Sequence, residues 1–253
     1  MILEKFSLKG KAALVTGSSR GLGEGIARAL AQAGANVAVH GSRSAPAQVV
    51  KRIEAIGVQS LGLAGDVSKH DVCASLVEQV VRHFGAIDIL VNNAGTIRRA
   101  PALQHSLDDW QTVLSTNLSS VFHLSQAAGR HMVPRGRGKI INIASLLTFQ
   151  GGITVPSYAA AKGGVGQLTK AFANEWAAKG VNVNAIAPGY METDNTEALR
   201  ANPERSRQIL ERIPAGRWGT PEDLAGAAVF LASAASDYIH GHVLVVDGGW
   251  LSR

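Results

Sequence analysis

The chain alternates between short apolar runs and longer segments in which apolar residues recur every three or four positions. The first pattern is typical of buried strands and the second of amphipathic helices. Strands that alternate with helices at this spacing predict an α/β chain with a parallel, doubly wound sheet. The expected strands lie at residues 11–15, 36–40, 60–67, 87–91, 139–144, 181–186 and 242–246.

Size and composition indicate a single folded domain. The chain has 253 residues, of which 46% are apolar and 17% are charged, so it has enough apolar material for one large core. We therefore expect one Rossmann-type domain over residues 1–253. The polar stretch at about 190–216 is interpreted as a small, mobile helical lid over the ligand crevice.

Charge and cysteine content narrow the possible functions. The net charge is +6, but Lys and Arg are scattered, which disfavours nucleic-acid binding and suits an anionic small ligand. The single cysteine, Cys73, allows no disulfide within the chain, and a reducing cytoplasm is expected. We see no signal-peptide pattern and no apolar run of about 18 residues, so no membrane partner is expected. The eight histidines lack ligand spacing, so no metal site is expected.

A glycine-rich turn follows the first expected strand. Residues 16–23 read Thr-Gly-Ser-Ser-Arg-Gly-Leu-Gly and lead into a helix. A strand, a glycine-rich turn and a helix in this order are typical of dinucleotide sites. Gly17 would permit the tight turn, and Gly21 and Gly23 would let backbone amides approach a pyrophosphate at the helix N-terminus.

The residues at the end of the second expected strand indicate whether the cofactor carries a 2′-phosphate. NAD-binding folds usually carry an acidic residue there, which binds the ribose hydroxyls. Here the segment continues as Gly41-Ser42-Arg43, and no acidic residue occurs between Glu24 and Glu54. The guanidinium groups of Arg20 and Arg43 suit a 2′-phosphate, which favours NADP(H). NAD(H) stays possible, because both arginines could be solvated loop residues.

Ser145, Tyr158 and Lys162 form the candidate catalytic group. Tyr158 and Lys162 are four residues apart in an expected helix, so their side chains share one face. A nearby ammonium favours the phenolate, so we expect the pKa of Tyr158 to fall and the residue to act as a general acid and base. Ser145 follows an apolar strand, where side chains point into the crevice of a parallel sheet.

A polar residue interrupts a long expected helix at about residues 108–132. Asn117 lies in its interior, where asparagine is unfavourable because its side chain competes for backbone hydrogen bonds. Two interpretations stay open at this point. The amide is either satisfied by the surrounding protein or holds a water molecule.

Taken together, these motifs resemble the short-chain dehydrogenase/reductase family over essentially the full chain. The resemblance implies that Tyr158 transfers the proton, that Lys162 assists it and holds the nicotinamide ribose, and that Ser145 orients the substrate. It also implies that Asn117 holds a water in a proton relay, and that the protein is a homotetramer. The motifs are residues 16–23, Asp66 with Val67, residues 92–95, Asn117, Ser145, Tyr158 with Lys162, and Pro188 and Gly189 with Thr193.

The same resemblance assigns the cofactor contacts. It implies that Asp66 binds the adenine, that residues 93–95 line the adenosine ribose, and that residues 186–189 with Thr193 meet the nicotinamide. The expected cofactor-binding residues are Gly17, Ser19, Arg20, Gly21, Leu22, Gly23, Ser42, Arg43, Asp66, Val67, Asn93, Ala94, Gly95, Tyr158, Lys162, Pro188, Gly189 and Thr193.

Within this family, several segments are similar to the 2-dehydro-3-deoxy-D-gluconate 5-dehydrogenase subgroup, also described as 2-deoxy-D-gluconate 3-dehydrogenases. That subgroup is usually NAD-linked, which opposes the local preference for NADP(H). The segments are residues 93–99, 145–156, 187–191 and 213–218.

The resemblance and the residues agree on hydride transfer between a nicotinamide and a secondary alcohol or ketone of a sugar acid. Alternatives are a carbonyl or 3-oxoacyl-type reductase of the same family and a non-catalytic regulator that binds NAD(P). For the carboxylate of a sugar acid we expect one of Arg98, Arg99, Gln150 and Arg200, with Arg217 a further candidate. Each arginine could equally form a surface or interface ion pair. The apolar C-terminus, with Trp250, is expected at a subunit contact.

Overall fold

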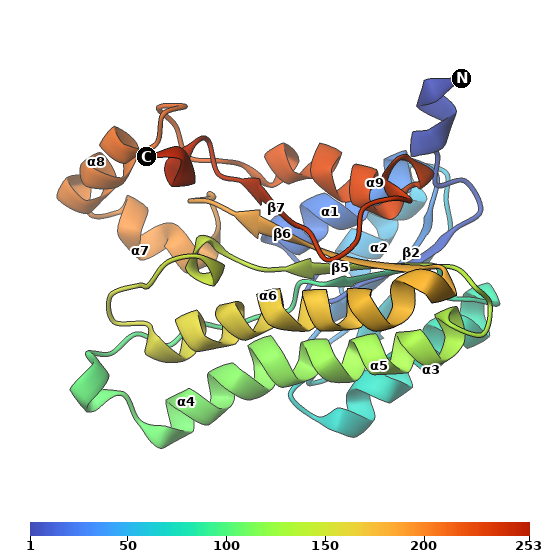
Figure 1. Ribbon diagram of the computed structural model, residues 1–253, viewed down its shortest axis with the longest axis horizontal. Helices are drawn as coiled ribbons and strands as arrows, with labels where there is room; N and C mark the ends of the chain where they lie inside the picture. Colours follow the sequence, from blue (N-terminus) through green and yellow to red (C-terminus); the bar gives the residue numbers. More distant parts are fainter.

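The computed structural model describes residues 1–253, apart from the side chain of Asn195. Within the described chain, seven strands form one parallel sheet with helices on both faces (Figure 1). The prediction of a doubly wound α/β domain is therefore confirmed. The strands are β1 (Ala12–Val15), β2 (Asn36–Gly41), β3 (Ser60–Ala64), β4 (Ile89–Asn92), β5 (Gly138–Ile143), β6 (Val181–Pro188) and β7 (Val243–Val246).

The strand order places a crevice beside β1. Across the sheet the order is β3-β2-β1-β4-β5-β6-β7, so the chain first builds outward from β1 to β3 and then returns to β4. The loops after β1 and β4 therefore diverge to opposite faces and leave a ligand crevice at the carboxyl ends of the strands. Val15 in β1 pairs with Val39 in β2 and Val91 in β4, which brings three strand ends together.

Helices cover the sheet in two layers, and this explains the unbroken apolar runs of the central strands. β1, β4 and β6 are buried along their whole length, as expected for parallel strands covered on both faces. Helices α1 (Gly21–Gln32), α2 (Ala47–Glu54) and α9 (Ala225–Ala232) pack on one face. Helices α3 (His70–Phe84), α5 (Ser120–Met132) and α6 (Pro156–Trp176) pack on the other, where α5 and α6 run side by side (Figure 1).

The long helix expected at 108–132 is present, but its winding changes at Asn117. Helix α4 (Leu107–Leu114) continues through a π-helical turn, η3 (Ser115–Ser119), into α5. The amide group of the fully buried Asn117 bonds to the backbone of Thr96 at both ends, accepting from its N–H and donating to its carbonyl, each at 2.8 Å. The protein thus satisfies one N–H and one oxygen lone pair of the amide, and the water expected at Asn117 stays a prediction.

The segment at 190–216 is helical and packs on the C-terminal tail. It contains the 3-10 turn η6 (Asp194–Thr196) and helices α7 (Glu197–Arg200) and α8 (Pro203–Arg212). Ile209 and Ile213 form a small cluster with Trp250, which is 5% exposed and also lies 4.0 Å from the Arg212 guanidinium. Trp250 is thus buried largely by its own chain, and the subunit contact expected at the C-terminus stays a prediction.

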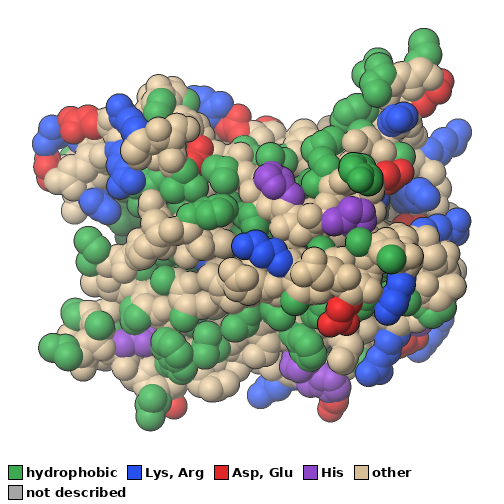
Figure 2. Space-filling model, in the orientation of Figure 1, with side chains coloured by type: hydrophobic (Ala, Val, Ile, Leu, Met, Phe, Trp, Pro, Cys, Tyr) green, Lys and Arg blue, Asp and Glu red, His purple; other side chains and the backbone are tan. Residues whose placement is uncertain are grey.

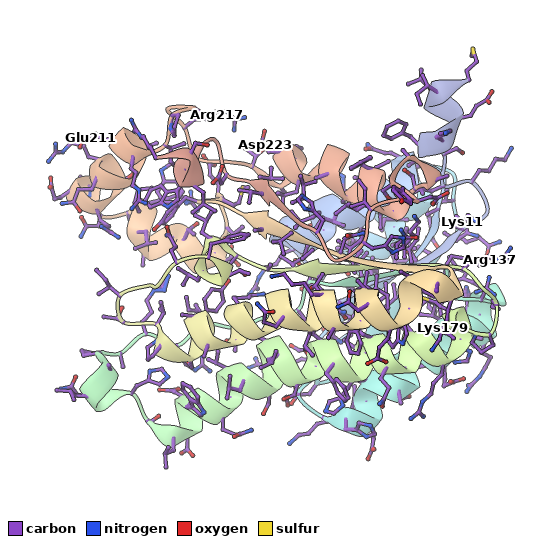
Figure 3. All side chains as sticks on the ribbon, viewed as in Figure 1. Lys11, Arg137, Lys179, Glu211, Arg217 and Asp223 are labelled. Carbon is purple, nitrogen blue, oxygen red and sulfur yellow. The ribbon has the colours of Figure 1, made fainter. Side chains whose placement is uncertain are left out.

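Several charged side chains lie at the two ends of the sheet. In Figure 3, Arg217 and Asp223 lie toward the crevice end, whereas Lys11, Arg137 and Lys179 lie at the opposite end, just before β1, β5 and β6. The face over α5 and α6 carries mainly apolar and uncharged atoms (Figure 2). None of the helices in the described chain is long and apolar enough to cross a membrane.

Candidate active site

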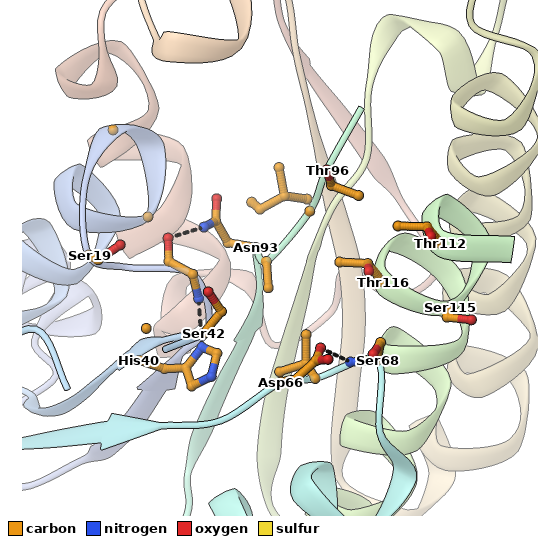
Figure 4. Close-up of a pocket in the computed structure, with 18 of the residues that line it drawn as sticks. Ser19, His40, Ser42, Asp66, Ser68, Asn93, Thr96, Thr112, Ser115 and Thr116 are labelled. Carbon is orange, nitrogen blue, oxygen red and sulfur yellow. Dashed lines mark hydrogen bonds between the residues drawn. The ribbon is translucent and has the colours of Figure 1, made fainter. Parts of the chain in front are cut away.

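A cavity of about 1190 Å³ runs along the carboxyl ends of β1, β2, β4 and β5 (Figure 4). Of the expected cofactor-binding residues, all but Pro188 and Gly189 line it. The members expected from the sequence are Gly17, Ser19, Arg20, Gly21, Leu22, Gly23, Ser42, Arg43, Asp66, Val67, Asn93, Ala94, Gly95, Tyr158, Lys162 and Thr193.

The glycine-rich loop is packed against the loop that follows β4. Gly17 has a φ of +61°, and a Cβ there would come within 2.8 Å of the Ala94 backbone. The Asn93 side-chain amide donates to the carbonyls of Thr16 at 2.9 Å and Gly17 at 3.0 Å. A Cβ at Gly23 would overlap both that amide and the Gly17 carbonyl. Gly23 is therefore required by packing inside the protein, and not only by the approach of a ligand.

The end of β2 has no room for a side chain. A Cβ at Gly41 would overlap the carbonyl oxygen of Ser44, because the loop after β2 folds back over the strand end. The acidic residue that NAD-binding folds usually place in this region is thus excluded here by sterics as well as by sequence. Arg43 lines the cavity beside Gly41, together with Lys69, which the sequence reasoning missed.

Arg20 bridges the glycine-rich loop and the helical segment. Its Nε atom lies 2.8 Å from a carboxylate oxygen of Asp194, and both residues line the cavity. The two side chains are largely exposed, so the pair contributes little stability by itself. This partner was not expected from the sequence.

Asp66 lies at the far end of the cavity, after β3. Its Oδ1 atom accepts a hydrogen bond from the Ser68 N–H at 3.0 Å (Figure 4). That bond holds the pKa of the carboxyl below its ordinary value, so Asp66 is an anion at neutral pH and accepts hydrogen bonds.

Tyr158, Ser145 and Lys162 converge at the other end. Ser145 follows β5 and begins the 3-10 turn η4 (Leu146–Thr148), in which its Oγ accepts from the Leu147 N–H at 3.2 Å. It does not line the cavity, but a side-chain hydrogen bond joins it to Tyr158. Lys162 is 4% exposed, donates from Nζ to the Ile143 carbonyl, and lies 5.7 Å from the centre of the Tyr158 ring.

The expectation that the pKa of Tyr158 falls is wrong for this structure. Burial raises the pKa of the phenol, and it outweighs the hydrogen bond from Ser145 and the positive charge of Arg99, which both lower it. Burial also lowers the pKa of Lys162 to about 8. Because the ammonium bonds to a strand carbonyl and not to the phenol, it does not offset the desolvation of Tyr158.

The candidate substrate-binding side chains have different partners in the structure. Arg99 alone among them acts electrostatically on Tyr158 in the described part of the chain. Arg98 pairs with Asp109 at 3.2 Å, and Arg200 donates to the Thr193 carbonyl at 3.4 Å. Gln150 accepts from the indole N–H of Trp250 at 3.4 Å. Arg217 forms two bonds of 2.7 Å to Asp223, so this further candidate is occupied by an ion pair.

Sequence reasoning missed one wall of the cavity. A row of polar side chains on α4 and η3 faces it, three or four positions apart, and this helical spacing was a signal that could have revealed the row. Gly189, by contrast, packs tightly against Asp247 at the end of β7. The unexpected lining residues include His40, Ser68, Thr96, Thr112, Ser115 and Thr116, which Figure 4 labels, and also Lys69, Asp108, Gln111, Ile143 and Asp194.

Comparison with known proteins agrees with the geometry of this site. A family model described as "Enoyl-(Acyl carrier protein) reductase" matches residues 17–251. The chain belongs to the short-chain dehydrogenase/reductase family, which confirms the resemblance inferred from its motifs.

Individual relatives indicate which members of this family the chain resembles. The chain is 55% identical to the 2-dehydro-3-deoxy-D-gluconate 5-dehydrogenase of Escherichia coli K12, over 100% of both chains. It resembles the crystal structure of an Agrobacterium tumefaciens protein assigned as a 2-deoxy-D-gluconate 3-dehydrogenase with bound NADP (TM-score 0.90, 54% identity, 98% and 99% coverage). It also resembles a gluconate 5-dehydrogenase from Burkholderia cenocepacia in complex with NADP and tartrate (TM-score 0.95, 42% identity, 100% coverage of both).

Proposed function

We propose that this protein is an NADP(H)-dependent dehydrogenase that interconverts a secondary alcohol and a ketone of a sugar acid of the 2-dehydro-3-deoxy-D-gluconate type. The observation that carries the proposal is the convergence of Ser145, Tyr158 and Lys162 at one end of a dinucleotide-sized cavity, with the Arg99 cation acting on Tyr158. The relatives named above act on closely related substrates.

The cavity fits a phosphorylated dinucleotide. The glycine-rich loop offers backbone N–H groups at the N-terminus of α1, where a pyrophosphate is favoured. At the adenosine end, Gly41 brings no carboxylate that would repel a 2′-phosphate, and Arg20, Arg43 and Lys69 supply positive charge for it. Asp66 would accept from the adenine amino group. We therefore assign NADP(H) as the preferred cofactor and retain NAD(H) as an alternative to be tested.

Tyr158 would handle the proton of the reaction. A bound nicotinamide supplies or accepts the hydride at the substrate carbon. Because burial raises its pKa, Tyr158 is a neutral phenol at neutral pH and can donate a proton to the oxygen of a ketone. In alcohol oxidation the same oxygen must first lose its proton, so that direction requires higher pH.

Ser145 and Lys162 would position this chemistry. The Ser145 hydroxyl bonds to the phenol and can also bond to the substrate oxygen, so it holds both atoms in line. Lys162, anchored on the Ile143 carbonyl, would keep its remaining N–H donors for the nicotinamide ribose. The proton relay through Asn117 remains a proposal, since its amide is bonded to Thr96 on both sides.

Arg99 is the proposed contact for the substrate carboxylate. It stands close enough to Tyr158 for its charge to lower the pKa of that phenol. A guanidinium can hold a carboxylate through two parallel hydrogen bonds and so fix the distance from the acid group to the reacting carbon. Gln150 and Arg200 are secondary candidates.

The test is turnover by the purified protein. Oxidation of NADPH and of NADH is followed with a panel of 3-keto and 5-keto hexonates, and the reverse reaction is followed with 2-dehydro-3-deoxy-D-gluconate. We expect turnover of at least one sugar acid and a higher kcat/KM with NADPH. An acetoacetyl thioester is the control for the acyl-reductase alternative. Activity on the thioester alone would refute the substrate assignment, and cofactor binding without any turnover would favour the non-catalytic alternative.

We also propose a cytoplasmic homotetramer that serves carbohydrate metabolism. The face over α5 and α6 has few charges (Figure 2). Two aromatic side chains, Trp110 in α4 and Phe122 in α5, expose more than a third of their surface. Apolar surface of this kind is typical of subunit contacts. Light scattering should give four times the mass of the chain, and Phe122→Glu should give a smaller species.

A further inference from the structure

One histidine of the cavity has no place in the chemistry proposed above. His40 lies near the end of β2, is 1% exposed, and reaches the cavity below the glycine-rich loop (Figure 4). It stands between two segments that are distant in sequence, the loop after β1 and the loop after β3. Each segment supplies one end of the proposed dinucleotide site.

Both ring nitrogens of His40 are used. Nδ1 accepts a hydrogen bond from the Gly17 N–H at 3.1 Å, and Nε2 lies 2.8 Å from the Gly65 carbonyl oxygen. The N–H can only donate and the carbonyl can only accept. The ring is therefore neutral, with its proton on Nε2, and no other protonation state satisfies both partners.

The backbone of His40 strengthens the same connection. Its N–H donates to the Ser18 hydroxyl, and its carbonyl accepts from the Ser18 N–H, each at 2.9 Å. Gly65 in turn donates to the Gly41 carbonyl at 3.1 Å and immediately precedes Asp66. Four bonds through one residue thus join the glycine-rich loop to the loop that carries Asp66.

We propose that His40 is a positioning residue that sets the spacing between the pyrophosphate end and the adenine end of the site, and that its protonation releases the glycine-rich loop and weakens dinucleotide binding in mild acid. This inference rests on the proposed function only for the identity of the ligand as a dinucleotide.

The acid sensitivity follows from the geometry. An imidazolium has no acceptor, so two N–H groups would face each other at the Gly17 bond. An unpaired buried donor costs roughly 1–3 kcal/mol, which corresponds to about a fivefold to 150-fold loss of affinity. Burial lowers the pKa of His40 from 6.5, and the hydrogen bond to the Gly65 carbonyl and the nearby Asp66 carboxylate oppose that shift. The other charged side chains that line the cavity are Arg20, Arg43, Lys69, Asp108, Lys162 and Asp194. The change should therefore occur below pH 6.5.

The experiment measures binding of ADP-ribose by calorimetry between about pH 5 and pH 8, the range in which histidine titrates. ADP-ribose contains the adenosine and the pyrophosphate, lacks a 2′-phosphate, and has no group that titrates in this range. Asp66 stays ionised throughout, because its pKa is lowered from 3.8. We expect the dissociation constant to rise about fivefold or more below pH 6.5 in the unmodified protein.

Two variants distinguish the hydrogen bond made by Nδ1 from the one made by Nε2. His40→Asn places a carbonyl oxygen near the position of Nδ1 and can keep the bond to Gly17. His40→Gln places an N–H₂ group near the position of Nε2 and can keep the bond to Gly65. Neither side chain titrates, so both variants should lose the pH dependence, with weaker binding at neutral pH in the glutamine variant. His131→Gln is the control, because His131 pairs with Glu78 outside the cavity lining and should leave the profile unchanged.

A wild-type pH profile in both His40 variants, or a flat profile in the unmodified protein, would overturn the proposal. If the variants fail to fold, nitrogen NMR of the unmodified protein decides the question. The ring should be the neutral Nε2–H form at pH 7 and gain a proton as ADP-ribose affinity falls; any other form at pH 7 contradicts the inference. Because the readout is binding, an absence of sugar-acid turnover would refute the proposed function and leave this test intact.

Discussion

The two ends of the cavity are built in different ways. At the dinucleotide end, buried groups and bare backbone determine the shape: Gly17 and Gly23 are packed against Asn93, and His40 connects two loops. At the proposed substrate end, the candidate side chains are long and some of their hydrogen bonds are loose, such as the 3.4 Å bonds of Gln150 and Arg200. Close packing tolerates little change, whereas long surface side chains can be exchanged at low cost. The first end should therefore be rigid, and the second should determine which substrate is used.

The largest effect on activity is expected at Tyr158, the proposed proton donor. Tyr158→Phe removes the proton donor and retains the ring, so kcat should fall by about 10³-fold, the range of general acid–base catalysis. Binding of NADPH, followed by fluorescence, should stay within about twofold, because the phenol oxygen contributes little to the rest of the cavity. Retained turnover would show that another group moves the proton.

The pH dependence should differ between the two directions of the reaction. The pKa of Tyr158 is raised above its ordinary value of 10.0, so the phenolate needed for alcohol oxidation grows as pH rises. Oxidation kcat/KM should increase by up to about tenfold per pH unit from neutral pH upward, while ketone reduction stays level in the same range. An oxidation rate that is already level near neutral pH would show that the phenol pKa is lowered in the working enzyme.

The rigidity of the dinucleotide end can be tested at Gly23. A Cβ at this position overlaps the Asn93 amide and the Gly17 carbonyl, so Gly23→Ala should cost about 2–3 kcal/mol in the free energy of unfolding and weaken NADPH binding. Gly226→Ala is the matched control, because it lies in α9 with open space around it. It should stabilise the protein by about 0.5–1 kcal/mol. Urea denaturation measures both, and equal effects would argue against the packing account.

The substrate end is tested by a pair of adjacent arginines. Arg99→Ala should raise KM for the sugar acid by about tenfold or more, the value of a charge-assisted hydrogen bond, with little change in KM for NADPH. Arg98→Ala is the control, because Arg98 pairs with Asp109 near the surface and should change KM by less than about twofold. If the two variants behave alike, the carboxylate is bound elsewhere.

The smallest effect concerns the ion pair at the base of the helical segment. The Arg217 guanidinium and the Thr220 N–H hold the pKa of Asp223 well below its usual value. The stability from this pair is present above the unfolded value of 3.8 and is lost as pH falls below it. Because both side chains are partly exposed, Asp223→Asn should cost no more than about 1 kcal/mol at neutral pH, measured by thermal denaturation. A larger loss would indicate that the pair anchors the whole segment.

Much of the fold and of the dinucleotide end could be predicted from the sequence. Alternating apolar runs and helical periodicity determine a parallel α/β sheet, because every strand must be covered on both faces. The glycine-rich turn and the spacing of Tyr158 and Lys162 are local patterns, and a local pattern is readable wherever the residues that form it are neighbours in sequence. The missing carboxylate after β2 was also visible in the sequence, as was the polar character of the segment at 190–216.

Only the tertiary structure decided which distant groups meet. The pKa of Tyr158 depends on burial and on where the Lys162 ammonium is directed, and neither follows from a spacing of four residues. Arg99 acts electrostatically on Tyr158, Arg20 pairs with Asp194, and His40 links Gly17 with Gly65. Each of these interactions joins segments that are separated along the chain. Such contacts depend on the packing of the whole sheet and its loops. That packing determines both the distance between two groups and the dielectric environment around them, and no single segment of sequence contains that information.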